Sequence, residues 1–337
     1  MAQVTVGIPV YNGAATLRRA VESILAQTHP AALVHISDNA STDDTAAIAE
    51  ALAAEHERVV FTRHPVNLGY SGNFGFVLGK AETDYFMWLA ADDHVEPTYL
   101  ERTLEALEAD PGLVAAVSQA LFVRPDGTRR RVEGTYSLLA DPITNLAVYL
   151  SKPSDNTRLF GVYRTWALRS AFPPRYFHAY DWTVAGGTLL YGGHLEIPET
   201  LMVRDETPSE AYVRAVRRDN PTTLGRLFPV LHMTMDLVVR QRIPLRWPVL
   251  KAMLKLNLEM HMNYVLLYHP RYGNIISPIL RKQLLWRLAA RQPPFNARNP
   301  TVRGSNSLQG PGLDHPATKS RSGPRPAGTP GGTPRAT

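Results

Sequence analysis

Short apolar runs alternate with segments of helical periodicity through the first 110 residues of the chain. Residues 4–9 form one such run, and Leu17, Val21, Ile24 and Leu25 then recur at the spacing of a single helix face. The alternation predicts strands over 4–9, 33–37, 58–62 and 84–89 and helices over 17–25, 43–54, 71–79 and 97–109. This β-α-β series is typical of an α/β fold with a mostly parallel, Rossmann-like sheet, helices on both faces and ligands at the carboxyl ends of the strands.

A less regular pattern begins after residue 112. The apolar stretch from Leu113 to Val123 predicts a strand, and Gly127 supplies the positive φ of the tight turn that follows. Shorter patterns predict helices over 141–151, 165–171 and 181–191 and strands near 159–163 and 194–197. We therefore expect the α/β body to extend over residues 1–221.

Residues 222–291 combine apolar stripes with interleaved Arg and Lys residues. The stripes comprise Leu227, Val230, Leu231, Leu237, Val238, Val249, Leu250, Met253 and Leu254. Pro229, Pro244 and Pro248 predict short helices rather than one long rod. Two interpretations stay open: a helical subdomain packed on the body, or amphipathic helices that rest on an anionic membrane. Residues 292–337 contain nine Pro and seven Gly, and we predict a disordered tail.

The net charge of +6 is distributed unevenly along the chain. Residues 1–221 carry −8, residues 222–291 carry +9 and residues 292–337 carry +5. An acidic body joined to a basic segment favours an anionic partner, either lipid head groups or nucleic acid. The basic half lacks aromatic residues arranged for base stacking, so we expect an anionic membrane surface and no nucleic acid.

The composition limits the cellular compartments and the kinds of chemistry that fit this chain. The chain has 337 residues with 44% hydrophobic content, which fits a soluble globular protein with a sizeable core. It has no cysteine, which excludes disulfides, thiolate metal sites and cysteine nucleophiles. The N-terminus lacks a secretory signal pattern, and no run approaches the roughly 18 apolar residues of a spanning helix. We expect a cytoplasmic protein, peripheral on the inner face of the cell membrane.

Carboxylates and small polar residues follow three of the predicted strands, in the loops 9–13, 37–44 and 91–94. Because the carboxyl ends of parallel strands meet at one edge of a sheet, we expect these loops to lie close together. An acidic residue there can accept a hydrogen bond from a nucleobase, and adjacent carboxylates can hold a divalent cation against a diphosphate. Asp43 and Asp44 are assigned to helix capping. The edge therefore fits a nucleoside diphosphate with its metal.

The same segments resemble the nucleotide-binding half of the family 2 glycosyltransferases, which have the GT-A fold. The motifs that carry this resemblance are Val6–Asn12, Ser37–Asp43, Asn67–Gly69 and Leu89–Asp93. The resemblance covers about residues 3–205 and is most specific in the first 100. It implies an inverting transferase with a nucleotide-sugar-binding half over 1–110 and an acceptor and catalytic half over 111–221.

The resemblance also implies roles for individual loop residues. Asp38 would hydrogen-bond the base, and Pro9 and Tyr11 would line the pocket for the base. Asp92 and Asp93 would hold Mg²⁺ or Mn²⁺ on the donor diphosphate. The further donor contacts are Asn12, Asn39, Asn67, Gly69 and Asp92 itself.

Two positions depart from the family pattern for the metal. Many members carry Asp-x-Asp at the metal loop, and Ala90 stands at the first Asp position here. His94 is either a helper of the adjacent aspartates or an ordinary loop residue. Relatives often have Arg-x-His after the strand near 197–203, and Glu206 occupies the place of that His. Glu206 is therefore either a further metal ligand or a surface acid.

In inverting sugar transfer a carboxylate takes the proton of the attacking acceptor hydroxyl. Tyr180-Asp181-Trp182 resembles the family segment that carries this base, although Tyr180 replaces the usual first acid. Asp181 is the candidate catalytic base, and it can also cap the helix that begins there. Arg164 has two interpretations, a contact to an acceptor phosphate or a solvated surface residue. Arg63 is a weaker candidate for a donor contact.

The expected function is transfer of a sugar from a UDP- or dTDP-linked donor to a glycan or lipid-linked acceptor in cell-surface polysaccharide synthesis, the acceptor resting on family analogy. The alternative is a catalytically inactive GT-A-fold binding or scaffold protein at the membrane surface, motivated by Ala90, Tyr180 and Glu206. A nicotinamide-dependent oxidoreductase is excluded because the glycines after the third strand have the wrong spacing.

Overall fold

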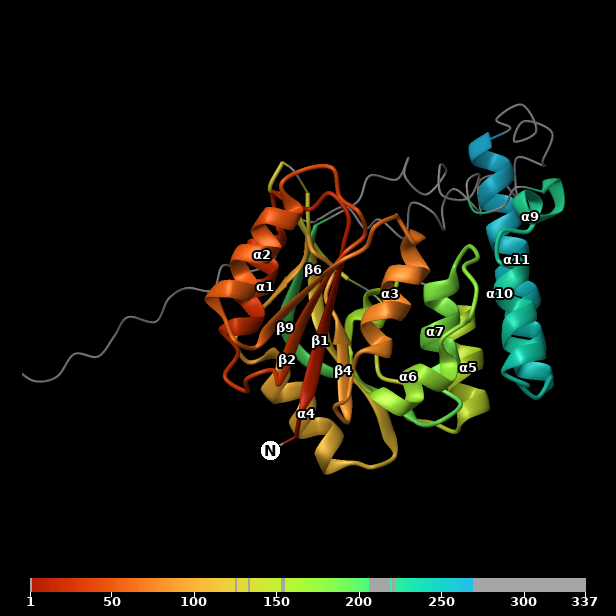
Figure 1. The fold of residues 1–337 in the computed structure, drawn as a ribbon. Helices are drawn as coiled ribbons and strands as arrows, with labels where there is room; N and C mark the ends of the chain where they lie inside the picture. Colours follow the sequence, from red (N-terminus) through yellow and green to blue (C-terminus); the bar gives the residue numbers. More distant parts are fainter. Residues whose placement is uncertain are drawn as a thin grey trace, which may run out of the picture. The chain divides into compact units, whose positions relative to one another are not determined.

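The computed structural model describes most of the chain up to residue 268. The described residues are 2–124, 126–132, 134–152, 155–205, 219 and 222–268. In this part of the chain a nine-stranded sheet runs in the order β3-β2-β1-β4-β8-β6-β9-β5, and β7 pairs with β6 (Figure 1). The predicted tail over 292–337 lies outside the described residues.

The N-terminal half of the sheet is parallel, as the alternation predicts. Its elements are β1 (Val4–Val10), α1 (Leu17–Leu25), β2 (Leu33–Asp38), α2 (Thr45–Glu55), β3 (Val59–Arg63), α3 (Gly69–Gly79) and β4 (Tyr85–Trp88). Figure 1 shows α1 and α2 on one face and α3 on the other. Every residue of β1 is buried, as expected of a central strand covered on both faces. A Cβ on Gly7 would lie 2.7 Å from Val77, so this glycine lets α3 approach the strand closely.

The C-terminal half of the sheet is mixed rather than parallel. Its elements are β5 (His94–Val95), α4 (Tyr99–Ala109), β6 (Leu113–Val123), β7 (Arg129–Arg131), α5 (Pro142–Ser151), η1 (Thr157–Phe160), β8 (Val162–Arg164), α6 (Thr165–Ala171), α7 (Tyr180–Thr188) and β9 (Gly193–Asp205). β8 runs antiparallel to β4 and β6, and β6 runs parallel to β9. The α/β fold is thus confirmed, and its parallel part is confined to β1–β4 and the β6–β9 pair.

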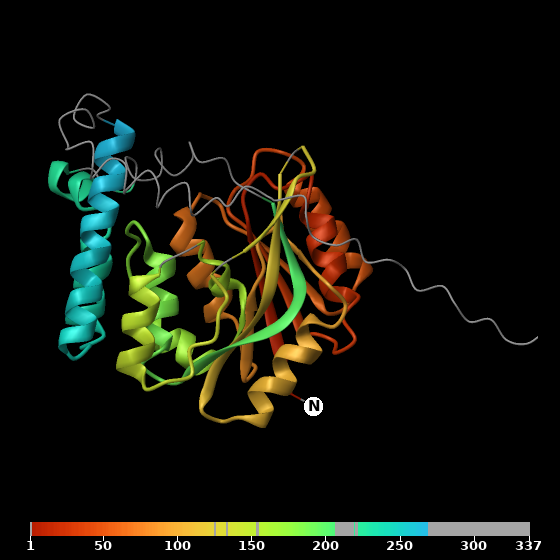
Figure 2. The ribbon, with the colours of Figure 1, turned by 180° about the vertical axis from the view of Figure 1, so that it is seen from behind.

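β9 is much longer than the predicted strand over 194–197, and Figure 2 shows it as a long curved strand. Pro198 lies directly after the predicted strand. In the structure the pairing with β6 shifts register at this point, from Ser118 opposite Ile197 to Gln119 opposite Thr200. A bulge accommodates the proline, which has no N–H to donate, and the strand continues to Asp205.

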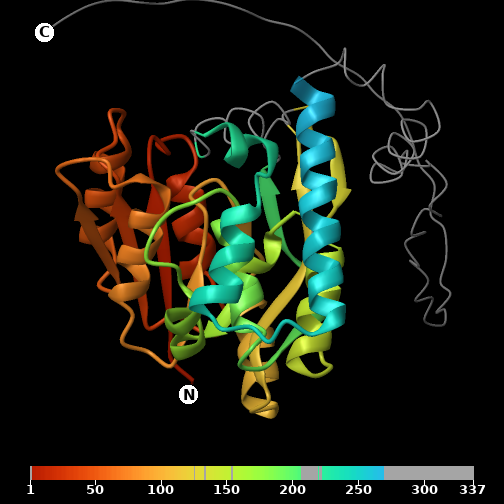
Figure 3. The same ribbon diagram turned by 90° about the vertical axis from the view of Figure 1, so that its right-hand side faces the viewer.

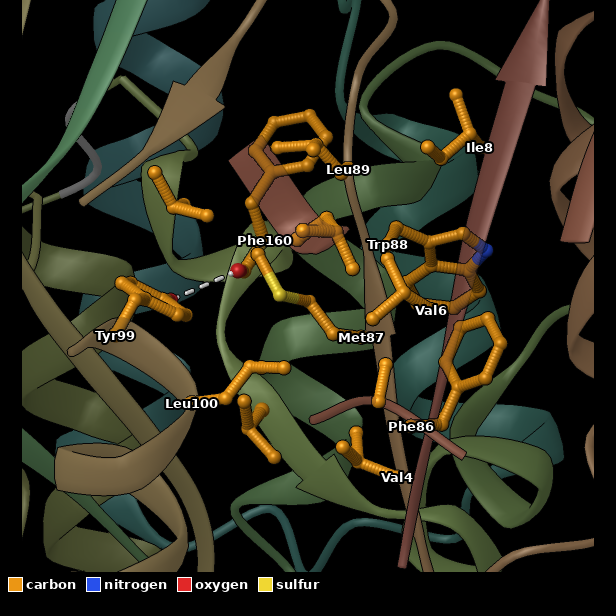
Figure 4. Close-up of a cluster of buried hydrophobic side chains, with 14 of the residues drawn as sticks. Val4, Val6, Ile8, Phe86, Met87, Trp88, Leu89, Tyr99, Leu100 and Phe160 are labelled. Atoms are coloured by element: carbon orange, nitrogen blue, oxygen red, sulfur yellow. Dashed lines mark hydrogen bonds between the residues drawn. The ribbon is translucent and has the colours of Figure 1, made fainter. Parts of the chain in front are cut away.

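The main hydrophobic core fills the space between the sheet and its helices. Figure 4 shows side chains of β1 and β4 packed with Tyr99 and Leu100 of α4. The Tyr99 hydroxyl donates to the Phe160 carbonyl at 3.0 Å, and the Trp88 indole donates to the Phe74 carbonyl at 3.1 Å. These buried polar groups are satisfied within the core, so the strand ends that carry the site rest on a rigid base.

The C-terminal helices pack on the body around a second core. They are α9 (Thr223–Leu227), α10 (Leu231–Met235), the π-helix η2 (Asp236–Arg240) and α11 (Trp247–Tyr268). Val230, Leu237, Val249 and Met253 of the predicted stripes are buried there against α5 and α7. Figure 3 shows α10 and α11 on the side of the body that faces the viewer. For these four residues the packed helical subdomain is the interpretation that fits, whereas Leu254 of the same stripes is 60% exposed.

The prediction that prolines divide this region into short helices is wrong beyond Pro248. α11 continues for 22 residues, because Pro248 lies in its first turn, where the missing N–H would have no intrahelical partner. No helix within the described ranges is both long enough and apolar enough to cross a membrane. Residues 1–292 cluster as one compact unit.

Candidate active site

Asp38 lies at the carboxyl end of β2 and is completely buried. Its Oδ1 accepts a hydrogen bond from the Ser41 backbone N–H at 2.9 Å. Its Oδ2 lies 3.3 Å from Nε of the half-exposed Arg63, and it accepts no hydrogen bond from any described residue. A buried carboxylate oxygen without a donor is costly, and a ligand N–H would satisfy it. This geometry fits the predicted contact between Asp38 and a nucleobase.

The loop after β1 is fastened to the loop after β2 through Asn12. Its side-chain Oδ1 accepts from the Thr42 backbone N–H at 2.8 Å, and its own backbone N–H donates to Ser41 Oγ at 2.8 Å. Asn12 has a φ of 53°, a conformation that Asn tolerates better than most residues. Next to it Tyr11 is half exposed, whereas Pro9 is buried in β1. The two loops therefore form one fixed unit with an aromatic ring at its surface.

Asn39, Asn67 and Gly69, which were predicted as donor contacts, lie together in the structure. The Asn39 amide donates to Asn67 Oδ1 at 3.0 Å and to the Gly69 carbonyl at 3.2 Å, and its Oδ1 accepts from the Leu68 N–H at 2.7 Å. Gly69 has a φ of +75°, which begins α3 with a turn that a side chain would strain. The side-chain hydrogen bonds of Asn39 and Asn67 thus hold the start of α3 in place.

The two aspartates after β4 have different surroundings. Asp92 is exposed, and its carboxylate makes no hydrogen bond or ion pair with a described residue. Asp93 is buried, with Oδ2 accepting from Arg204 Nε at 2.9 Å and Oδ1 from the Asp205 N–H at 3.2 Å. Burial raises the pKa of Asp93 to about 6, against the opposing effect of the Arg204 charge. Asp93 is therefore engaged by the protein, and Asp92 is the carboxylate exposed to a ligand.

The described residues contain no group of three His, Asp or Glu side chains able to hold a metal by themselves. This arrangement still fits Mg²⁺, which is often bound through one or two carboxylates plus substrate phosphates. Arg19 supports the loop, donating to the Asp92 carbonyl at 2.6 Å and to Asp205 Oδ2 at 3.2 Å. Glu206, the other candidate ligand, lies outside the described residues.

Asp181 is the second residue of α7, and Ala179 occupies the N-cap position, so the prediction that Asp181 caps this helix is wrong. Ala179, just before the helix, has a φ of 60°, a strained conformation for a residue with a side chain. Burial raises the pKa of Asp181, while the Asn156 side chain and the Trp182 backbone N–H oppose the shift. A carboxylate with a raised pKa at a strained helix start is typical of a catalytic base.

Tyr70 links the two ends of the site, and sequence reasoning missed it. Its ring stacks on Phe74 with centroids 4.2 Å apart and meets Tyr180 edge-on at 5.5 Å. Its pKa is raised, first by desolvation of the hydroxyl and then by the charge of Asp181, with a smaller contribution from Asp92. Asp181 and Asp92, which lie 89 residues apart in the chain, therefore both act on one phenol. The only sequence signal for Tyr70 is its place directly after Asn67-Leu68-Gly69.

Several other candidates have structural roles. Arg164 donates to the Leu113 and Leu107 carbonyls at the amino end of β4, so its assignment to an acceptor phosphate is wrong. Asp43 accepts from the Ala14 and Thr45 N–H groups, in keeping with a local stabilising role. His94 pairs with β9 as part of β5, and burial lowers its pKa. A pocket of about 490 Å³ lies near the amino ends of the strands, away from all these residues.

The sheet topology and the acidic loops at its carboxyl edge are those of the GT-A glycosyltransferase fold. The crystal structure of residues 1–349 of S. aureus TarS matches with a TM-score of 0.56 at 16% identity, covering 85% of this chain and 78% of that one. Its complex with UDP-GlcNAc matches with the same TM-score at 14% identity. Residues 5–169 are a glycosyl transferase family 2 domain, because the sequence model of that family matches them.

Curated relatives share only part of their length with this chain. The succinoglycan biosynthesis protein ExoO of Rhizobium meliloti is 31% identical over 147 residues, which are 44% of this chain and 41% of that protein. The chondroitin synthase of Pasteurella multocida is 31% identical over 125 residues, 37% of this chain and 13% of that enzyme. The chain thus spans less than half the length of either relative.

Proposed function

We propose that the protein is an inverting glycosyltransferase that takes a sugar from a nucleoside diphosphate donor. The observation that carries the proposal is a pair of acidic residues in different surroundings: Asp92 is exposed after β4, and Asp181 lies in the first turn of α7, whose Tyr180 ring meets Tyr70 edge-on at 5.5 Å. One carboxylate is exposed at the predicted diphosphate position, and the other has the raised pKa of a base. A site that only bound a ligand, without transferring a sugar, would not need both the exposed carboxylate of Asp92 and a base at Asp181.

The chemistry follows from these two positions. The acceptor hydroxyl attacks the anomeric carbon, and a new C–O bond forms as the bond to the diphosphate oxygen breaks. The hydroxyl proton passes to the Asp181 carboxylate, and the electron pair of the broken bond leaves with the diphosphate. Asp92 would hold Mg²⁺ or Mn²⁺, which would stabilise the negative charge of the leaving diphosphate. Arg19, through the Asp92 carbonyl, and Arg204, through Asp93, keep the Asp92 loop in place.

The donor is proposed to carry uracil or thymine. Oδ2 of Asp38 can accept the ring N–H of either base, and the structural neighbour TarS is described in complexes with UDP and UDP-GlcNAc. The acceptor is proposed to be a glycan or a lipid-linked glycan, as in synthesis of a cell-surface polysaccharide. Relatives named as a succinoglycan biosynthesis protein and a chondroitin synthase support this acceptor class.

The test is a thermal shift panel of UDP, dTDP, GDP and CDP, each with Mn²⁺, Mg²⁺ or EDTA. A ligand that binds the folded state raises the apparent melting temperature. We expect UDP or dTDP with metal to give the largest shift, and Asp92→Asn to remove the metal-dependent part. The matched control is Asp44→Asn, an exposed residue of the next loop whose side chain makes no capping bond. Release of UDP from sugar donors then measures turnover.

The second candidate, an inactive scaffold with the same fold, is favoured by Ala90 at the usual first metal position. It predicts either no nucleotide shift at all or a shift that metal and Asp92→Asn leave unchanged. A metal-dependent shift together with donor hydrolysis that Asp181→Asn abolishes would reject the scaffold.

A further inference from the structure

The long helix α11 has two opposite faces of different character. Val249, Met253 and Leu256 face the body and are buried in the second core. Trp247, Lys251, Leu254 and Leu258 recur at intervals of three and four residues, so they form one stripe on the other side. We define these four residues as the outer face of α11. The inner face accounts for the packing of the helix, whereas the outer face has no such role.

The apolar side chains of the outer face are strongly exposed to solvent. Trp247 is 71% exposed, and Leu254 and Leu258 are each 60% exposed. Leu245, in the loop before the helix, is 55% exposed. Large apolar side chains gathered at one place on a surface mark an interaction site, whereas single ones do not. The exposed apolar residues therefore require a partner.

The charges around the outer face are basic. Arg242 and Arg246 precede the helix, and Lys251 lies within the stripe; all three are exposed, and none forms an ion pair with a described side chain. The sequence contains no Asp or Glu between Asp236 and Glu259. These cations thus keep their charge available to an external anion, in contrast to Arg240, which pairs with Asp236 at 2.7 Å.

We propose that the outer face of α11 docks the protein on an anionic lipid bilayer. Trp and Leu on one stripe with Arg and Lys beside them is the pattern of a helix that lies in the membrane interface, with the apolar side chains among the lipid tails and the cations at the head groups. The helix cannot span a bilayer, which agrees with a position in the plane of the interface.

Two other occupants are disfavoured by charge. A second copy of the chain, related by a two-fold axis through this face, would bring Lys251 and the nearby arginines of both copies together. Residues 269–337 carry eleven Lys and Arg against a single acid, so this segment would also be repelled. An anionic lipid surface would match both the apolar stripe and the cations beside it.

Docking through this face would bring the candidate site close to the membrane. α11 packs on α5, and α5 contacts α7, which begins at Tyr180, next to the proposed base Asp181. The docking surface thus deepens the proposed function, because an enzyme held in this way would meet a lipid-linked acceptor at the bilayer. Its test does not depend on turnover.

The experiment is vesicle co-sedimentation of the full chain with phosphatidylcholine vesicles, with and without phosphatidylglycerol. Point variants are needed because deleting residues 222–337 would uncover the apolar residues of α5 and α7. The test variant is Trp247→Ser/Leu254→Ser/Leu258→Ser. The matched control is Trp166→Ser/Leu139→Ser, because Trp166 and Leu139 are similarly exposed but lie on other elements.

The basic C-terminal residues would also bind anionic vesicles through charge alone, so salt separates the two contributions. At about 0.5 M salt the electrostatic attraction is screened, and apolar insertion remains. We expect the wild type and the control to keep bound protein at this salt and the triple variant to lose at least about tenfold in its partition coefficient. Arg246→Glu/Lys251→Glu should weaken binding mainly at low salt.

Three results would overturn the proposal. They are no binding of the wild type to anionic vesicles, unchanged binding of the triple variant at high salt, and a wild-type dimer that the triple variant converts to monomers. The nucleotide thermal shift of each variant shows that it is folded. A normal shift without vesicle binding would reject the membrane surface alone, whereas vesicle binding without any nucleotide shift would reject the proposed function alone.

Discussion

Arg204 donates its Nε to Oδ2 of Asp93 at 2.9 Å, and this ion pair joins the end of β9 to the loop after β4. The same guanidinium donates to Thr157 Oγ1 at 2.8 Å and lies over the Phe160 ring at 4.5 Å. Asp93 is almost completely buried, and Arg204 is mostly so. The pair therefore holds the loop that presents Asp92 and removes Asp93 from contact with solvent.

Removing Arg204 should destabilise the protein strongly, and more so at high pH. In Arg204→Gln the Asp93 carboxylate would be left buried without its cation, which costs roughly 3–5 kcal/mol. The pKa of Asp93 is already raised on folding, to about 6, so the protonated acid is the form that the fold favours. The destabilisation should be larger at about pH 8 than at about pH 5, where Asp93 takes up a proton. Urea unfolding at both pH values measures it.

The control for this variant is Arg102→Gln. Arg102 forms ion pairs with Glu105 and Glu199 at the surface, where water and salt screen the charges. We expect no measurable change in its unfolding midpoint. A pH-independent loss in Arg204→Gln would mean that packing on Phe160, rather than the charge of Asp93, explains the effect.

The first half of the fold could be predicted from the sequence almost to the residue. β1 and β4 are mostly apolar and fully buried, and α1 has a regular apolar face, so local pattern and tertiary packing agree there. The prediction was less accurate where one residue type is compatible with two local structures. Pro248 was predicted to end a helix, but it lies in the first turn of α11, and the strand predicted over 194–197 continues through a bulge to Asp205.

The site could be predicted only as far as its motifs are local. Asp38 and Asp92 were found because each follows a strand, and the fold carries them to one edge. The engagement of Asp93 by Arg204 depends on residues 111 positions apart in the chain. No local pattern encodes such a contact, so the sequence assigned Asp93 to the metal on equal terms with Asp92. Tyr70 was missed for the same reason.

Asp181→Asn should abolish sugar transfer and stabilise the fold. Loss of the base is expected to lower kcat by about 10²- to 10⁴-fold. The pKa of Asp181 is raised on folding, so this residue favours the fold while it is protonated and loses that contribution as the pH rises through its pKa. The melting temperature of the variant should therefore exceed that of the wild type at about pH 8 and equal it at about pH 4.

At Asp126 we expect the opposite change in melting temperature at about pH 8. Asp126 is an exposed turn residue whose pKa is lowered by the hydrogen bonds that it accepts from Thr128. Asp126→Asn should leave turnover unchanged and should not raise the melting temperature at any pH. If Asp181→Asn kept wild-type turnover, another group would have to be the base. If it also melted earlier than the wild type at pH 8, the carboxylate would have a stabilising structural partner.

Asp38→Asn should weaken nucleotide binding without harming the fold. The change replaces an anionic acceptor with a neutral amide, so a charge-assisted hydrogen bond to the base is lost, and the dissociation constant for UDP should rise about 10- to 100-fold. The free protein loses the ion pair between Oδ2 and Arg63, whose side chain is half exposed to screening by water, and it keeps the hydrogen bond that Oδ1 accepts from Ser41. Calorimetric titration with UDP measures the change. Unaltered affinity would show that the base binds elsewhere.

Tyr70→Ala should reduce turnover far more than Tyr70→Phe. Tyr70 is 47% exposed and its ring is held by Phe74 and Tyr180, so the ring is a preformed surface beside the start of α7 against which a sugar can be positioned. Loss of the ring should lower kcat/KM by about 10- to 100-fold, whereas loss of the hydroxyl alone leaves the stacking in place. Steady-state kinetics of donor turnover measure both.

The matched control is Tyr191→Ala, an exposed tyrosine that packs on Trp166 away from the site, which should keep wild-type values. Equal losses in Tyr70→Phe and Tyr70→Ala would instead assign the effect to the hydroxyl, whose pKa Asp181 and Asp92 both raise.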